Sequence, residues 1–136
     1  MEHKDLDKLS ELIEKIEQTE KFAVIREAIS KNGVTQPGYL EPMPIVDDFF
    51  HLVYELDLII KFDWMHWEEG GKILNQKDYD FSQLSKHDLC KVLTVIVRGD
   101  RFYEGTLVMR LEDGTILKIL KAIQNSVTIC TIYKPN

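Results

Sequence analysis

The sequence predicts a single, mainly α-helical domain of about five to seven helices with a proline-rich loop. Its 136 residues fit one ordinary domain, and a composition of 44% hydrophobic and 29% charged residues is typical of a globular protein. Apolar residues recur at helical spacing in several separate segments. Between these segments lie proline, glycine and aspartate residues, which start or end helices.

Residues 1–31 are predicted to be helical. Apolar side chains lie three and four positions apart in the first half of this segment, and the spacing continues in the second half. Asn32-Gly33 is interpreted as the point where the helix stops. The pattern leaves open whether this segment is one helix or two that meet near Thr19. The apolar positions are Leu6, Leu9, Leu12, Ile13, Ile16, Phe22, Ile25, Ala28 and Ile29.

Residues 33–46 are predicted to be a surface loop. They hold three of the four prolines, Pro37, Pro42 and Pro44. Each proline pushes the residue before it toward an extended conformation, so a helix is not expected here.

Residues 47–124 are predicted to form the helical core. Asp47 or Asp48 can cap its first helix, and Asp63 can cap a second one that carries Trp64 and Trp67. Ser85-Lys86-His87-Asp88 has the pattern of a capping box ahead of a further apolar helix, which breaks at Gly99-Asp100.

Residues 106–120 fit two structures equally well. Asp113-Gly114 between alternating apolar residues is typical of a hairpin turn, but the same residues also have helical spacing, with Gly114 as the stop of one helix. Residues 125–136 are predicted to be an extended tail, because β-branched residues between Val127 and Tyr133 favour a short strand.

Several motifs in the second half of the chain resemble an uncharacterised family of small prokaryotic proteins, a domain of unknown function. These are Phe62-Asp63-Trp64-x-x-Trp67, the apolar helix 89–98, Asp100-Arg101-Phe102-x-Glu104-Gly105-x-Leu107, and the break at Glu112-Asp113-Gly114 before Ile116–Leu120. The resemblance covers roughly residues 45–124.

This resemblance implies a mainly helical domain, which favours two helices over residues 106–120. It implies no activity. Familiar members often carry a cysteine where this chain has Tyr103, so a thiol-based role at that position is excluded. They also have a glycine-rich segment where this chain has Tyr39–Ile45.

Charge and cysteine content restrict the function classes. The net charge of −6 gives no basic footprint for nucleic acid, so nucleic-acid binding is not expected. Residues 39–70 carry one base and eight acids, which also permits a mimic of nucleic acid that occupies a basic protein groove. Two cysteines need no disulfide framework, and neither a signal peptide nor a membrane span is evident, so we expect a cytoplasmic protein.

Two clusters are candidates for a ligand or partner site. Arg98, Asp100, Arg101 and Glu104 could grip a carboxylate or phosphate. The favoured interpretation is an internal ion-pair clasp in which Glu104 caps the next helix. Trp64 and Trp67 could stack a ligand or contact a partner, although paired tryptophans more often line a core.

The sequence contains no complete catalytic or metal-binding motif. His66, Glu68, Glu69, His87 and Cys90 lack the spacing of a known metal motif, and no nucleophile motif or phosphate-binding loop is present. We therefore expect no cofactor and no metal. The leading hypothesis is a non-enzymatic accessory or protein-interaction module, including a homodimer. The alternative is a small-molecule or anion-binding protein, including a hydrolase, that uses the Arg98/Arg101/Glu104 cluster and the Trp64/Trp67 wall.

Overall fold

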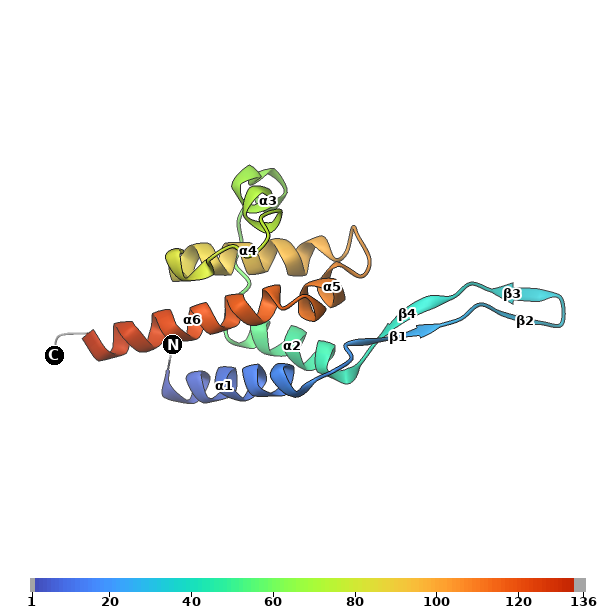
Figure 1. The fold of residues 1–136 in the computed structure, drawn as a ribbon, viewed down its shortest axis with the longest axis horizontal. Coiled ribbons are helices and arrows are strands. Elements are labelled where there is room, and N and C mark those ends of the chain that lie inside the picture. The colour runs from blue at the N-terminus through green and yellow to red at the C-terminus, as the bar shows by residue number, and fades with distance from the viewer. Residues whose placement is uncertain (1, 134–136) are drawn as a thin grey trace.

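The computed structural model describes the backbone from Glu2 to Tyr133 and the side chains as far as Val127. Within this part of the chain the structure is mainly helical, with six α-helices and four short antiparallel strands (Figure 1). The helices form a body, and the strands form an arm that extends away from it. The helices are α1 (His3–Gln18), α2 (Pro44–Glu55), α3 (Glu68–Leu74), α4 (Lys86–Gly99), α5 (Thr106–Glu112) and α6 (Thr115–Tyr133). Two short 3₁₀ turns, η1 (Trp64–His66) and η2 (Phe81–Gln83), precede α3 and α4.

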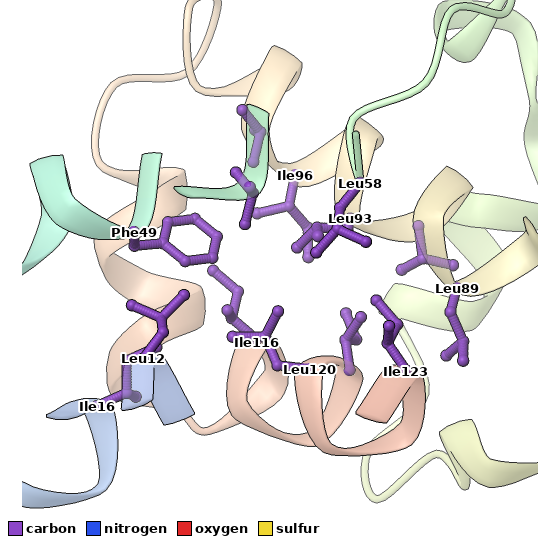
Figure 2. Close-up of a cluster of buried hydrophobic side chains, with 14 of the residues drawn as sticks. Leu12, Ile16, Phe49, Leu58, Leu89, Leu93, Ile96, Ile116, Leu120 and Ile123 are labelled. Carbon is purple, nitrogen blue, oxygen red and sulfur yellow. The ribbon is translucent and has the colours of Figure 1, made fainter. Parts of the chain in front are cut away.

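Helix α6 is the centre of the body. It packs against α1 on one side and against α4 and α5 on the other. Its buried residues Ile116, Ile119, Leu120 and Ile123 are fully inaccessible to solvent. Figure 2 shows Ile116, Leu120 and Ile123 facing side chains of three other helices: Leu12 and Ile16 of α1, Phe49 of α2, and Leu89, Leu93 and Ile96 of α4. The apolar stripes read from the sequence in α1 and α4 therefore meet on one shared core.

The segment between α2 and η1 is held by a buried hydroxyl. Thr94 of α4 is fully buried, and its Oγ1 donates to the carbonyl oxygen of Cys90 at 2.7 Å. The same oxygen accepts a hydrogen bond from the amide of Ile60 at 3.0 Å. One side chain thus satisfies a backbone amide that belongs to no helix or strand.

The four strands pair as one long hairpin, which we call the β arm (residues 23–42). Its base pairs β1 (Ala23–Arg26) with β4 (Tyr39–Pro42), and its distal half pairs β2 (Ile29–Lys31) with β3 (Val34–Gln36). The two halves meet where Gly38 lies against the opposite strand. A β-carbon at position 38 would stand 2.8 Å from the carbonyl oxygen of Arg26, so only glycine fits without a backbone shift.

The arm overturns two sequence predictions. The predicted helical segment 1–31 is helical only to Gln18, and the predicted loop 33–46 contains β3, β4 and the start of α2. Asn32 and Gly33 form the two-residue tip, with φ angles of 54° and 75°. Positive φ at both positions is the type I′ turn that joins two strands, so Asn32-Gly33 starts a hairpin instead of ending a helix.

The C-terminal predictions have mixed outcomes. Two helices over residues 106–120 are confirmed, since Gly114 separates α5 from α6 with a φ of 85°. The predicted extended tail is wrong because α6 continues to Tyr133; residues 134–136 of that prediction lie outside the described residues. Among the described residues, we find no helix with the length and apolar character needed to cross a bilayer.

Candidate functional site

The predicted Arg98–Glu104 cluster occupies the turn between α4 and α5. Asp100 accepts a hydrogen bond from the amide of Leu107 at 3.0 Å and so caps α5. Arg98 lies over the ring of Tyr54 in α2, 5.9 Å from its centroid. Arg101 and Glu104 are exposed. The helix-capping role expected of Glu104 therefore belongs to Asp100.

The two tryptophans lie in different environments. Trp64 contacts Phe102 of the α4–α5 turn, with ring centroids 5.9 Å apart. Trp67 packs against the core and lies edge-on to Phe62. The ammonium of Lys91 sits 4.2 Å from the Trp67 ring centroid and 5.1 Å from that of Phe62. The structure thus joins Trp64 to the arginine-containing turn, whereas Trp67 is engaged with a lysine of its own chain.

The remaining chemical candidates do not converge. Asp63, predicted as a helix cap, does occupy the N-cap position of η1, but its side chain contacts Nδ1 of His66 at 2.9 Å and makes no capping hydrogen bond. Burial raises the pKa of the Cys90 thiol, and the nearby Lys86 opposes this shift only in part. A thiol with a raised pKa is a poor nucleophile near neutral pH. Across the described residues, the histidine, cysteine and carboxylate side chains form no group of three that could hold a metal ion.

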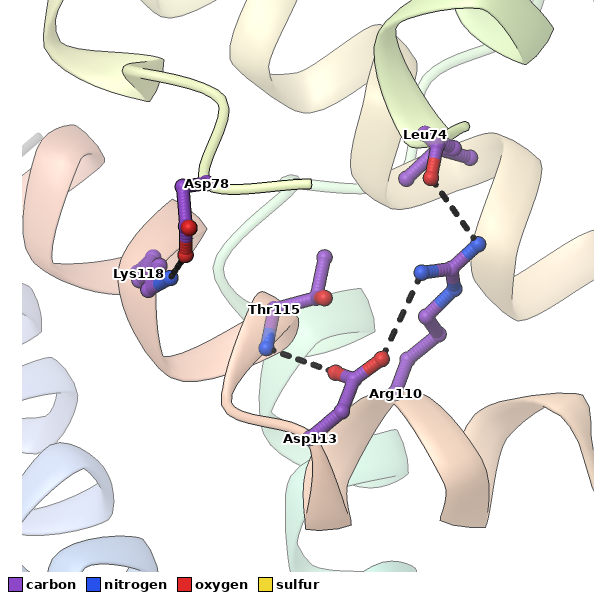
Figure 3. Close-up of polar contacts among 6 residues, drawn as sticks. All are labelled: Leu74, Asp78, Arg110, Asp113, Thr115 and Lys118. Carbon is purple, nitrogen blue, oxygen red and sulfur yellow. Dashed lines mark hydrogen bonds and ion pairs between the residues drawn. The ribbon is translucent and has the colours of Figure 1, made fainter. Parts of the chain in front are cut away.

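A polar pocket lies between the end of α3 and the junction of α5 with α6. It encloses about 360 Å³. Figure 3 shows Arg110 donating to the carbonyl oxygen of Leu74 at 3.2 Å and to Asp113 at 3.4 Å. Asp113 also accepts from the amide of Thr115 at 2.9 Å, which caps α6. The charged groups drawn together here therefore join α3, α5 and α6, and sequence reasoning did not identify them as a cluster.

The lip of this pocket carries a weaker ion pair. Lys118 lies 4.0 Å from Asp78, and both side chains are more than half exposed. Asp78 has a φ of 59°, in the left-handed region that residues other than glycine seldom adopt. This pair is the most easily displaced contact around the pocket, because exposed ion pairs contribute little to stability.

The β arm carries four of the large apolar side chains that are exposed among the described residues. Ile25 is 77% exposed, Ile29 60%, Val34 65% and Tyr39 59%. Most large aliphatic residues in a folded domain are buried, so their exposure along a projecting ribbon is unusual. Sequence reasoning placed Ile25 and Ile29 on a helix. The signal that identifies the arm is Asn32-Gly33, the strongest two-residue hairpin pattern.

A groove separates the base of the arm from α5. It encloses about 520 Å³. One wall is made by Ala23, Ile25 and Leu40 of the arm, and the other by Val108 and Met109 of α5. Met109 is 50% exposed, so the groove is open and its walls are mainly apolar. We call this feature the arm groove; Lys21, Val24, Gly105 and Glu112 complete it.

Comparison with known proteins identifies a family. A family model described as a family of unknown function, DUF6508, matches residues 1–128. No curated protein and no solved structure matches the chain. The match covers the β arm, the arm groove and the polar pocket.

Proposed function

The chain belongs to DUF6508, a family whose function is unknown, and we propose that it is a non-enzymatic accessory module that binds another polypeptide chain through its β arm. One observation carries this proposal: Ile25, Ile29, Val34 and Tyr39 are each at least 59% exposed on the arm. Covering such side chains removes apolar surface from water, which is the main driving force of association between proteins.

The architecture of the arm supports the same function. An isolated two-stranded ribbon is marginally stable in water, and ribbons gain stability when a further surface packs against them. The distal half pairs only β2 with β3, and every residue of both strands is exposed. Each strand therefore also presents an unpaired edge, which is a common template for binding another chain.

The polar groups of the body favour a structural role over catalysis. Asp100 and Asp113 each accept a backbone amide at the start of a helix. Arg110 is committed to Leu74 and Asp113. These contacts stabilise helix ends, and each would have to be broken for the same group to act on a substrate.

We place this function in the cytoplasm of a prokaryotic cell. Cys90 is a buried free thiol, and a free thiol is compatible with a reducing compartment. The prokaryotic assignment rests on the resemblance of the motifs at residues 62–67 and 100–107 to small prokaryotic proteins.

Photo-crosslinking in growing cells tests the proposed function. A benzophenone amino acid is placed at Ile29 on the arm and, as a matched control, at the exposed Lys72 on α3. We expect a discrete cross-linked species from position 29 and none from position 72, with the attached peptide identified by mass spectrometry. The proposal is wrong if position 29 gives no adduct or if the two positions give the same products.

A second candidate function has a specific observation in its favour. The contact between Trp64 and Phe102 puts an indole beside the turn that carries the exposed Arg101. We propose this surface as the alternative site for a small anion. A thermal-shift screen with nucleotides and small organic acids tests it. A ligand at 100 times its Kd adds about 2.7 kcal/mol of stability. The shift should disappear in Arg101→Ala, and a shift that survives this substitution excludes the site.

A further inference from the structure

We infer that the partner of the β arm is a second copy of this chain, with the distal half of each arm docked in the arm groove of the other copy. This inference rests on the proposed function and names the partner. The arm groove is an open apolar channel of about 520 Å³, and its walls include the half-exposed Met109 and the exposed Ile25. It needs an occupant that is apolar and narrow.

The distal half of the arm has these properties. In β2 and β3, Ile29 pairs with Gln36 and Lys31 pairs with Val34. Residues paired across antiparallel strands share one face, and alternate residues of a strand share it too. Ile29 and Val34 therefore lie diagonally on one face, with Lys31 and Gln36 beside them. The opposite face carries only Ser30 and Thr35. The distal half of the arm thus has one face with two apolar side chains and one face that is entirely polar.

The positions of these two features permit reciprocal docking. The groove is lined by residues of β1 and β4 at the base of the arm, and Ile29 and Val34 belong to β2 and β3 at its far end. Figure 1 shows how far β2 and β3 extend from the helical body. Two arms placed side by side in opposite directions bring each tip to the base of the other. A single two-fold axis then satisfies both contacts at once, which is the self-complementary interface of most homodimers.

Charge complementarity favours the second copy over an unrelated chain. Residues 29–36 carry a single charge, that of Lys31. Glu112 lies on the rim of the groove and is exposed. Neither charge has an ion-pair partner among the described residues. In the reciprocal arrangement Lys31 of one copy approaches Glu112 of the other. The two-fold axis repeats this ion pair, so each of the two apolar contacts has one ion pair beside it.

The proposed contact is slightly smaller than a standard interface, which involves about 20–30 residues on each side. The distal half of the arm supplies residues 29–36, and the groove supplies Lys21, Ala23, Val24, Ile25, Leu40, Gly105, Val108, Met109 and Glu112. Interfaces of this size are typical of dimers that exchange with the monomer.

Sedimentation velocity over a range of concentrations tests the inference with matched variants. We expect the wild type to form dimers. The double variant Ile29→Asp/Val34→Asp should raise the dissociation constant of the dimer at least about a hundredfold, because two carboxylates would be buried in an apolar groove. Ser30→Asp/Thr35→Asp puts the same charge on the opposite face of the same strands and should leave the Kd within about threefold of wild type. A wild type that stays monomeric, or equal effects of the two pairs, would overturn the inference.

A charge exchange tests the predicted pairing directly. Lys31→Glu and Glu112→Lys should each weaken the dimer, and the double variant should restore it, because the ion pair is re-formed with its signs reversed. Both residues are exposed, so circular dichroism should give wild-type helix content for each variant. An additive loss in the double variant would contradict the pairing of Lys31 with Glu112.

Cross-linking in a mixture separates this inference from the proposed function. Benzophenone at position 29 of an unlabelled chain, mixed with ¹⁵N-labelled chain, should attach to the labelled peptide that contains Met109. If position 29 instead attaches in cells to a different protein while the purified chain is monomeric, the second-copy inference is wrong and the proposed function stands. If it attaches to nothing in either setting, both are wrong.

Discussion

The indole of Trp67 lies directly over the backbone of Gly70, so close that a β-carbon on Gly70 would stand 2.5 Å from Cε3 of the ring. This contact explains why a glycine occupies the interior of the short helix α3, where it is unfavourable for helix formation. The neighbouring Gly71 has open space around its own missing β-carbon. The structure therefore requires a glycine at position 70 but leaves room for a side chain at position 71.

Alanine substitutions should separate them. Gly70→Ala should lower the free energy of unfolding by about 1–3 kcal/mol, because the Trp67 ring must move out of its packed position. Gly71→Ala should raise it by up to about 1 kcal/mol, because alanine is the better helix former. Urea denaturation monitored by tryptophan fluorescence measures both. Equal effects of the two substitutions would show that the Trp67 contact does not determine the residue at position 70.

The cap of α5 gives a second matched pair. Asp100→Ala should cost about 1 kcal/mol of stability, because the amide of Leu107 loses its acceptor. Glu104→Ala, on the same turn and exposed, should change stability by less than about 0.5 kcal/mol. Both values come from urea midpoints at constant m-value. A larger loss of stability in Glu104→Ala than in Asp100→Ala would instead support the ion-pair clasp predicted from the sequence, in which Glu104 caps the helix.

The Cys90 thiol predicts a stability change at alkaline pH. Burial raises its pKa in the folded protein above the ordinary value of 9.0. The folded state therefore favours the neutral thiol, and this contribution is fully present below pH 9.0 and is lost as the pH rises through the folded pKa. Between pH 8 and pH 11, the midpoint temperature of the wild type should fall more steeply than that of Cys90→Ala. Parallel curves for the two proteins would contradict a buried neutral thiol.

Gly38 predicts a local effect on the β arm. Gly38→Ala should disturb the arm, because its β-carbon would meet the carbonyl oxygen of Arg26 at 2.8 Å and the amide nitrogen of Ala28 at 3.2 Å. Hydrogen exchange should become faster in residues 23–42 and stay unchanged in α4 and α6, which pack mainly against other helices. Faster exchange throughout the helical body would show that the arm and the body unfold together.

The sequence predicted the helical body better than the arm. The Ser85 cap of α4 is confirmed, since its Oγ accepts from the amide of Asp88 at 3.1 Å. The apolar stripe of α1 is also confirmed, because Leu9, Leu12, Ile13 and Ile16 are buried. Both features depend on residues close together in the sequence, a capping side chain and apolar positions at helical spacing, and the helices that carry them face a large core.

The arm was missed for a physical reason. Phe22, Ile25, Ala28 and Ile29 have helical spacing, but of these only Phe22 is buried. The spacing of a few apolar residues does not reveal whether they share a face or project into solvent from a ribbon. Asn32-Gly33 and Asp113-Gly114 have similar turn patterns, yet the first joins two strands and the second separates two helices. The surfaces that flank each pair decide the outcome, and these form only in the folded chain.

Predictions about the candidate site were limited in the same way. The aspartate at position 100 and the two arginines were identified, but only the fold places Arg98 over Tyr54 and Asp100 at the start of α5. Trp64 and Phe102 are distant in sequence and meet through the packing of η1 on α4. The polar pocket likewise joins Leu74 to Arg110 across a long stretch of chain, which no short motif reports.

The packing of α1 against α6 has a consequence for synthesis of the protein on the ribosome. The apolar stripe of α1 emerges first, whereas its partner α6 begins at Thr115. At about 5–20 residues per second, about 5–20 s pass between the two. During this interval α2 can cover one side of α1, and the rest of the stripe is available to chaperones. The nascent chain should therefore be most vulnerable to aggregation just before α6 emerges.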